Sequence, residues 1–154
     1  MKKRQLIIIL TTLIIFIPTI SATAQTGKDY LGSWEWKGPM NREKEQVAVW
    51  VEIKKKGQKI VGSIWFNQLV DGEADGTDGS YVPFAGKMNG NTLVIEFDSG
   101  DVRGIDEENG VYRKPRRKPD TAVLLYKNGK LEWTQTSGSL DVGLDIPKKL
   151  MLRR

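Results

Sequence analysis

Three short turn sequences, each between runs of alternating apolar residues, constrain the fold of this 154-residue chain more than any other feature. Residues 47–53 and 60–66 alternate apolar and polar positions, the pattern of a half-buried β-strand. Gly57-Gln58 lies between them, and glycine at the first central position suits a two-residue type II′ hairpin turn. This turn pairs Val51 with Ile64, so that both apolar rows fall on one face of the hairpin.

A second hairpin is predicted at Asn89-Gly90, which has the chemistry of a type I′ turn. It pairs Phe84 with Ile95 and again gathers the large side chains on one face. Pro83 has no backbone N–H and cannot donate to a β-ladder, so we expect a bulge or a strand edge at that position.

A third hairpin is predicted at Asn128-Gly129, with Tyr126 opposite Leu131 and Leu124 opposite Trp133. In all three hairpins the turn chemistry and the hydrophobic pattern favour the same faces. This agreement is the main support for an all-β fold.

Flanking strands around residues 30–37 and 148–153 bring the total to about eight. A further candidate in residues 101–113 is weak because Gly104 and Gly110 interrupt it. Short antiparallel strands in sequence order, joined largely by tight turns, predict an antiparallel up-and-down β-barrel rather than a Greek-key sandwich.

The N-terminal segment has the three parts of a secretory signal peptide. A basic start at residues 2–4 precedes an apolar run at 6–20 and small residues at 21–24. The apolar run is fifteen residues long, whereas a membrane span needs about 18 or more. We therefore expect removal of residues 1–24 and a single exported domain, residues 25–154, in the periplasm or secreted.

Charge and composition exclude several classes of function. Without the three basic residues of the leader, the chain has 21 basic and 19 acidic residues, a net charge of +2, which argues against a nucleic-acid binder. The sequence contains no Cys and no His, which excludes His- or Cys-based metal and haem sites, the common catalytic triads and disulfides. We expect no cofactor, and stability must come from the apolar core.

An acidic segment at residues 71–76 is similar to the start of a calcium loop. Its oxygen-bearing side chains surround a glycine turn, as a hard cation prefers. The twelfth position of that pattern should hold a bidentate glutamate, but it is Val82. We therefore expect no metal site.

The segment Gly32-Ser33-Trp34 resembles the G-x-W signature that opens the first strand of lipocalins and related calycin barrels. The resemblance implies that Trp34 closes the base of a barrel and packs against an arginine of the last strand. Arg153 is the first choice for that arginine and Arg154 the second. The likeness is to small exported bacterial lipocalin-like domains, many of which have no assigned ligand.

The inward-facing side chains of the expected barrel contain no carboxylate and no lysine, which argues against an enzyme. Either a small apolar ligand lies in the barrel mouth, or side chains simply fill the barrel. We expect Trp36, Tyr126 and Trp133 to contact a ligand, since each has a large face and a polar group. The expected inward set is Trp34, Trp36, Val47, Val49, Val51, Ile53, Ile60, Ile64, Phe66, Val82, Phe84, Leu93, Ile95, Phe97, Leu124, Tyr126, Leu131 and Trp133.

Residues 113–119 form the strongest local charge cluster of the chain. The five basic residues are Arg113, Lys114, Arg116, Arg117 and Lys118. Pro115 and Pro119 keep this segment extended and non-helical. It could therefore present phosphate- or carboxylate-binding groups to an anionic envelope component. The alternative is a solvated loop that discourages strand pairing. No aromatic residue interleaves the cluster, which disfavours nucleic-acid binding.

The register of the first hairpin also places Trp50 opposite Trp65, with both side chains pointing away from the core. Such an outward pair is either a cross-strand contact or a surface for a protein partner or a homodimer. The sequence thus leaves a second function open: a solid-core interaction or inhibitor module that uses rim loops and this face.

Overall fold

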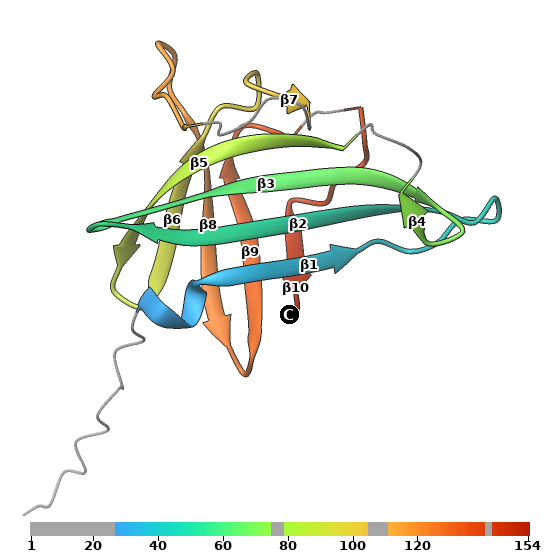
Figure 1. Cartoon of the computed structure of the whole chain (residues 1–154), viewed down its shortest axis with the longest axis horizontal. Helices are drawn as coiled ribbons and strands as arrows, with labels where there is room; N and C mark the ends of the chain where they lie inside the picture. Colours follow the sequence, from blue (N-terminus) through green and yellow to red (C-terminus); the bar gives the residue numbers. More distant parts are fainter. Residues whose placement is uncertain (1–26, 75–78, 105–110, 141–142) are drawn as a thin grey trace, which may run out of the picture.

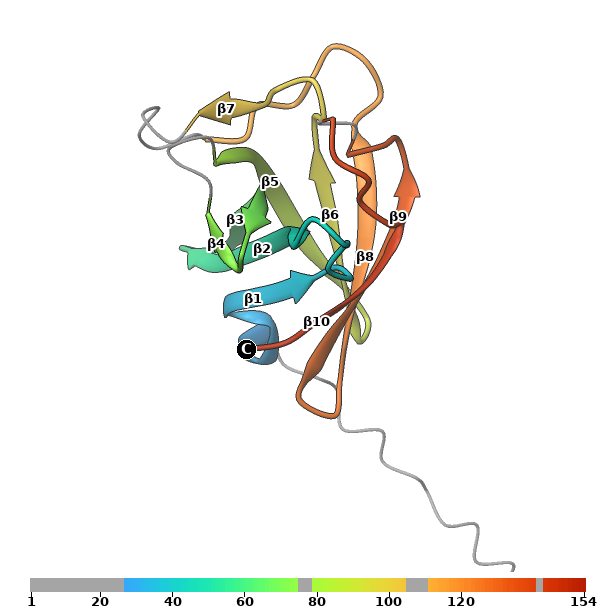
Figure 2. The same cartoon turned by 90° about the vertical axis from the view of Figure 1, so that its right-hand side faces the viewer.

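The computed structural model describes residues 27–74, 79–104, 111–140 and 143–154, and the expected signal peptide, residues 1–24, lies outside them. The strands are β1 (Gly32–Lys37), β2 (Glu45–Lys56), β3 (Lys59–Val70), β4 (Glu73–Ala74), β5 (Ser80–Asn89), β6 (Thr92–Phe97), β7 (Arg103–Gly104), β8 (Asp120–Lys127), β9 (Lys130–Ser137) and β10 (Lys149–Leu152). Figure 1 shows strands β1, β2 and β3 crossing in front of strands β8, β9 and β10. Figure 2 shows β2 and β3 on the opposite side of the barrel from β8 and β9.

Eight of these strands follow one another in sequence order, β1-β2-β3-β5-β6-β8-β9-β10, and every neighbouring pair is antiparallel. The first and last strands meet at a single bridge, where the backbone N–H groups of Glu35 and Arg153 each donate to the other's carbonyl at 2.7 and 2.8 Å. The predicted all-β, up-and-down, nearly closed barrel is therefore confirmed.

The weak strand candidate at residues 101–113 has no place in this path. Its described part includes only the two-residue strand β7, which pairs with β5, and residues 105–110 lie outside the described residues. The barrel closes without it because β6 pairs directly with β8. Pro83 lies between the segment of β5 that pairs with β7 and the one that pairs with β6, so among the described strands β5 has no partner there on that side.

Two of the three hairpins have the predicted register. Val51 lies opposite Ile64 between β2 and β3, and Leu124 lies opposite Trp133 between β8 and β9. The turn residues Asn128 and Gly129 have φ angles of 53° and 75°, as the two central positions of a type I′ turn require.

The predicted register of the second hairpin was wrong by two residues. Phe84 lies opposite Phe97 rather than Ile95, because the two-residue turn is Gly90-Asn91 and not Asn89-Gly90. Gly90 takes the left-handed backbone at φ 60°, and it stands at the first central position of the turn. A shift by an even number leaves every side chain on its expected face, so the predicted core is unaffected.

The predicted first strand began too early. Residues 27–30 form a short 3-10 helix, η1 (Gly27–Tyr30), and β1 begins at Gly32. No helix in the described part of the chain is long and apolar enough to cross a membrane.

The inward-facing side chains form one apolar core. All of the expected inward residues are buried except Trp36, Val47, Ile60 and Tyr126, which are half-buried. Leu140, on the loop after β9, adds to the same cluster.

The closed end of the barrel is built around Trp34, which is 1% exposed. Its Nε1 donates to the Tyr30 carbonyl at 2.9 Å, and its ring meets that of Tyr126 edge-on at 5.9 Å between centroids. The guanidinium over Trp34 belongs to Arg154, with Cζ 4.6 Å from the ring centroid. The first choice for this contact, Arg153, was wrong because the backbone of that residue bridges to β1 and the next residue reaches the ring.

Candidate functional site

A hollow of about 490 Å³ lies at the other end of β1, where the chain leaves Trp36. Its walls come from the end of β1, the start of β2, the end of β3 and the loop that leads into β10. We call it the mouth pocket and define it by Trp36, Val47, Gln68, Leu144 and Pro147. Trp36 lies two residues beyond Trp34, so the mouth pocket and the closed end occupy different levels of the barrel.

The mouth pocket combines an apolar wall with a polar rim. Trp36 and Leu144 both pack against the core while they line the pocket. At the rim, the Gln46 side chain donates to the Gly38 carbonyl at 2.7 Å. The amide of Gln68 has no hydrogen-bond partner among the described residues, so it can both donate to and accept from a ligand.

The three expected ligand residues do not lie together. Trp36 lines the mouth pocket, but Tyr126 packs against Trp34 at the closed end. Trp133 is 1% exposed and packs beside Phe97, with ring centroids 6.1 Å apart. Its Nε1 is buried and lacks a hydrogen-bond partner within the described part of the chain.

Sequence reasoning missed Gln68 and the residues of the loop before β10. The sequence did indicate the direction of Gln68: it lies two residues after the inward-facing Phe66 on β3, and alternate residues of a strand face the same side. Leu144 and Pro147 lie outside any strand, and no periodicity marks them.

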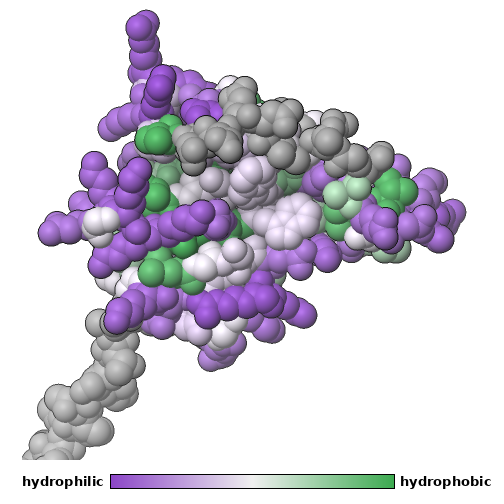
Figure 3. Space-filling view, in the orientation of Figure 1, coloured by the Kyte–Doolittle hydropathy of each residue, from purple (hydrophilic) through white to green (hydrophobic). Residues whose placement is uncertain are grey.

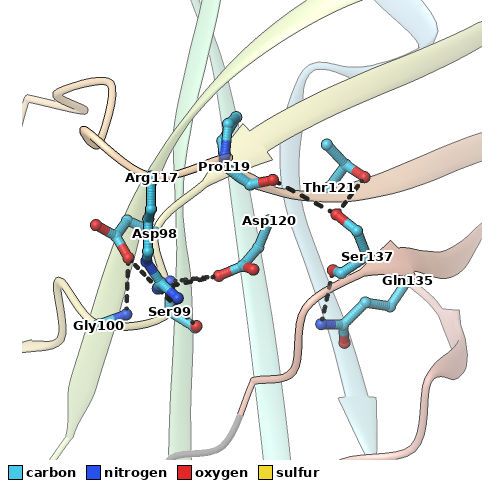
Figure 4. A network of polar contacts seen from close by, with 9 residues as sticks. All are labelled: Asp98, Ser99, Gly100, Arg117, Pro119, Asp120, Thr121, Gln135 and Ser137. Atoms are coloured by element: carbon cyan, nitrogen blue, oxygen red, sulfur yellow. Dashed lines mark hydrogen bonds and ion pairs between the residues drawn. The ribbon is translucent and has the colours of Figure 1, made fainter.

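The basic cluster divides into one anchored residue and four free ones. Arg117 hydrogen-bonds to Asp98 and lies 3.5 Å from the Asp120 carboxylate, which also accepts from the Ser99 backbone N–H at 2.9 Å (Figure 4). The hydrogen bond from Arg117 holds the pKa of Asp98 below its ordinary value. Arg117 is thus engaged at the base of the loop.

The other four basic side chains are exposed and form no ion pair within the described ranges; these are Arg113, Lys114, Arg116 and Lys118, the free basic set. Figures 1 and 2 show their segment as an orange loop that projects from the barrel before β8. The loop therefore presents positive charge to the surroundings rather than to the protein itself.

The acidic segment after β3 shows no cation-binding geometry in its described part. Asp71 pairs with Lys44 at 2.8 Å, and Asp71-Gly72 forms a turn with positive φ at both residues. Residues 75–78 of the expected loop lie outside the described residues. Across the described ranges, no group of three carboxylates is placed to hold a metal ion.

No protein-family model matches the chain, and no solved structure matches it either. The architecture itself, an antiparallel and nearly closed eight-stranded barrel, is compatible with a lipocalin- or calycin-like fold.

Proposed function

We propose that this protein is an exported, lipocalin-like binding protein that holds a small, partly apolar ligand in the mouth pocket. The observation that carries the proposal is the pocket volume of about 490 Å³, within the range of roughly 300–1,000 Å³ typical of small-molecule sites. The signal-peptide pattern of residues 1–24 supports export to the periplasm or the medium.

The chemistry of the lining indicates the kind of ligand. An apolar body would lie against Trp36, Val47 and Leu144, which lose contact with water when the pocket fills. One hydrogen-bonding group on the ligand would meet the Gln68 amide, which no described residue satisfies. Trp36 and Leu144 pack against the buried core cluster, so little ordering of these side chains is needed on binding.

Binding rather than catalysis is the proposed activity. Without Cys or His, the chain has no side chain whose ordinary pKa lies near neutrality for proton transfer. At the rim, the Gln46 side chain already donates to the Gly38 carbonyl, so the Gln68 amide is the group suited to orient a ligand.

Native mass spectrometry of the protein, purified from its own host without denaturation, tests the proposal. We expect a bound mass that disappears on organic extraction and is absent from Trp36→Ala and Gln68→Leu variants. The matched control is Trp50→Phe, an outward tryptophan on another face, which should retain the bound mass. A bare protein mass for the parent, or retention by all variants, would contradict a ligand in the mouth pocket.

The free basic set supports a second candidate function. We propose that the loop contacts an anionic envelope surface, to which each basic side chain contributes about 1 kcal/mol when it lies close to the surface. Vesicles of phosphatidylglycerol should retain the parent protein at low salt, and vesicles of phosphatidylcholine should not.

Charge-reversal variants test which basic residues bind the vesicles. Arg113→Glu with Lys114→Glu should abolish retention by phosphatidylglycerol. The control, Lys55→Glu with Lys56→Glu, makes the same change in net charge at the exposed tip of the β2–β3 hairpin and should bind nearly as well as the parent. Equal losses in both variants would show a non-specific charge effect and refute the role of the loop.

A further inference from the structure

We propose that the outer face of β1, β2, β3 and β5 binds a carbohydrate ring, at a site separate from the mouth pocket. A row of directly opposed residues crosses these strands, from Glu35 through Trp50, Trp65 and Tyr81 to Arg103 on β7. The predicted Trp50–Trp65 pair therefore lies at the centre of a longer array. We call its three aromatic residues, Trp50, Trp65 and Tyr81, the aromatic row.

The rings of the aromatic row are held in fixed orientations. Trp65 stacks on Tyr81 with ring centroids 4.5 Å apart and an interplanar angle of 30°. Trp50 donates its Nε1–H to a carboxylate oxygen of Glu35 at 2.9 Å, and Lys37 pairs with the same oxygen at 3.0 Å. Tyr81 is only 3% exposed, so a ligand would stack on Trp50 and Trp65. The contacts above already order both rings, which lowers the entropic cost of binding.

A hollow of about 300 Å³ lies beside the two tryptophans. Trp50, Trp65 and Asn67 line it from the sheet, and Ala74 and Gly79 line its edge. Figure 3 shows this face of the molecule, with a pale and green centre bordered by purple hydrophilic side chains. Flat aromatic surface and polar groups therefore meet in one shallow site.

A carbohydrate ring matches this combination better than a purely apolar molecule. The face of an indole is electron-rich and attracts the weakly positive C–H groups on one side of a pyranose ring. The hydroxyl groups at the edge of the sugar need donors and acceptors nearby. Asn67, whose amide has no hydrogen-bond partner among the described residues, supplies both.

Two charged side chains beside the aromatic row can also hydrogen-bond to a sugar. Glu35 can accept from a sugar hydroxyl, and Lys37 can donate to one, because both are partly exposed beside Trp50. An apolar ligand over this site would desolvate these groups without giving them partners.

Titration calorimetry with three soluble tetrasaccharides, cellotetraose, maltotetraose and chitotetraose, tests the proposal. We expect at least one to bind at millimolar concentration or below and to change the tryptophan fluorescence. Trp50→Ala and Trp65→Ala should each weaken binding by about tenfold or more, whereas Trp65→Phe should retain most of it.

Two further variants separate a loss of sugar binding from a loss of folding and from effects on the mouth pocket. Asn67→Ala removes an unpartnered amide, so it should weaken sugar binding while the circular dichroism spectrum and melting temperature stay unchanged. Trp36→Ala should leave sugar binding intact even where it removes the ligand of the mouth pocket.

Three outcomes would overturn the inference. One is that none of the three tetrasaccharides binds the folded parent protein. Another is that the Trp50 and Trp65 variants bind as the parent does. The third is that the variants change only the sedimentation of the protein at high concentration, which would assign the face to a second copy of the chain.

Discussion

Replacement of Arg154 by alanine should measurably destabilise the barrel. In the folded protein, the Arg154 guanidinium lies over the Trp34 ring and donates to the carbonyls of Asp29 and Leu31 at 3.2 and 3.0 Å. One side chain thus ties the end of the last strand to η1 and to the start of β1. Arg154→Ala removes all three contacts and leaves the core side chains in place.

The magnitude follows from those contacts. An exposed cation–π contact contributes about 0.5–1 kcal/mol, and each hydrogen bond adds a net of about 0.5–1.5 kcal/mol. Because Arg154 is exposed, values near the lower ends apply, and we expect a loss of about 1–2 kcal/mol in the free energy of unfolding. With a urea m-value of about 2 kcal/mol/M, the unfolding midpoint should fall by about 0.5–1 M.

Equilibrium urea unfolding, followed by circular dichroism, measures this shift. Arg153→Ala is the matched control, since it removes the same charge one residue earlier, while the contacts of Arg153 to Glu35 are made by its backbone and survive the change. Arg154→Lys keeps the charge but loses the planar group, so its midpoint should lie between those of the parent and Arg154→Ala. Equal midpoints for the Arg153 and Arg154 alanine variants would refute the reasoning.

Three further changes probe the barrel elsewhere. Gly62→Ala would place a Cβ 2.0 Å from a backbone oxygen of β2, so a thermal melt should show a loss of about 1–3 kcal/mol or more. Tyr30→Phe removes the hydroxyl that donates to the Asn91 carbonyl at 2.5 Å, and urea unfolding should show a loss of about 0.5–1.5 kcal/mol. Because Arg117 lowers the pKa of Asp98 in the folded state, their contact stabilises the protein above about pH 4 and is lost as the pH falls through the lowered value. Asp98→Asn should therefore lower the urea unfolding midpoint near neutral pH, and urea titrations in strong acid should show no difference from the parent.

The barrel could be predicted from local chemistry because turn type and hydrophobic parity both act over a few residues. The Gly57 and Asn128 turns fixed the strand pairing correctly, whereas at residues 89–91 two adjacent dipeptides could each form a tight turn. Parity cannot separate those two, since they differ by an even shift in register. The core was therefore predicted correctly although one register was not.

The candidate sites were harder to predict because they depend on contacts between distant segments. Tyr126 and Trp133 face the inside of the barrel, as Trp36 does. The alternation along a strand predicts this direction, but it does not predict how far along the barrel axis each side chain lies. Likewise, Arg153 and Arg154 are adjacent in sequence, and only the geometry of the last bridge determines which one reaches Trp34.

The two ends of the barrel differ in a way that favours function at the mouth. At the closed end, the indole N–H of Trp34 donates to the Tyr30 carbonyl, and the ring lies under Arg154. A ligand that entered there would have to break these contacts, which hold the two ends of the barrel wall together. At the mouth, Gln68 has an amide that the described residues leave unsatisfied, and Trp36 remains half-buried. We therefore expect substitutions at the mouth to affect the proposed ligand site without loss of the barrel, and substitutions at the closed end to lower stability first.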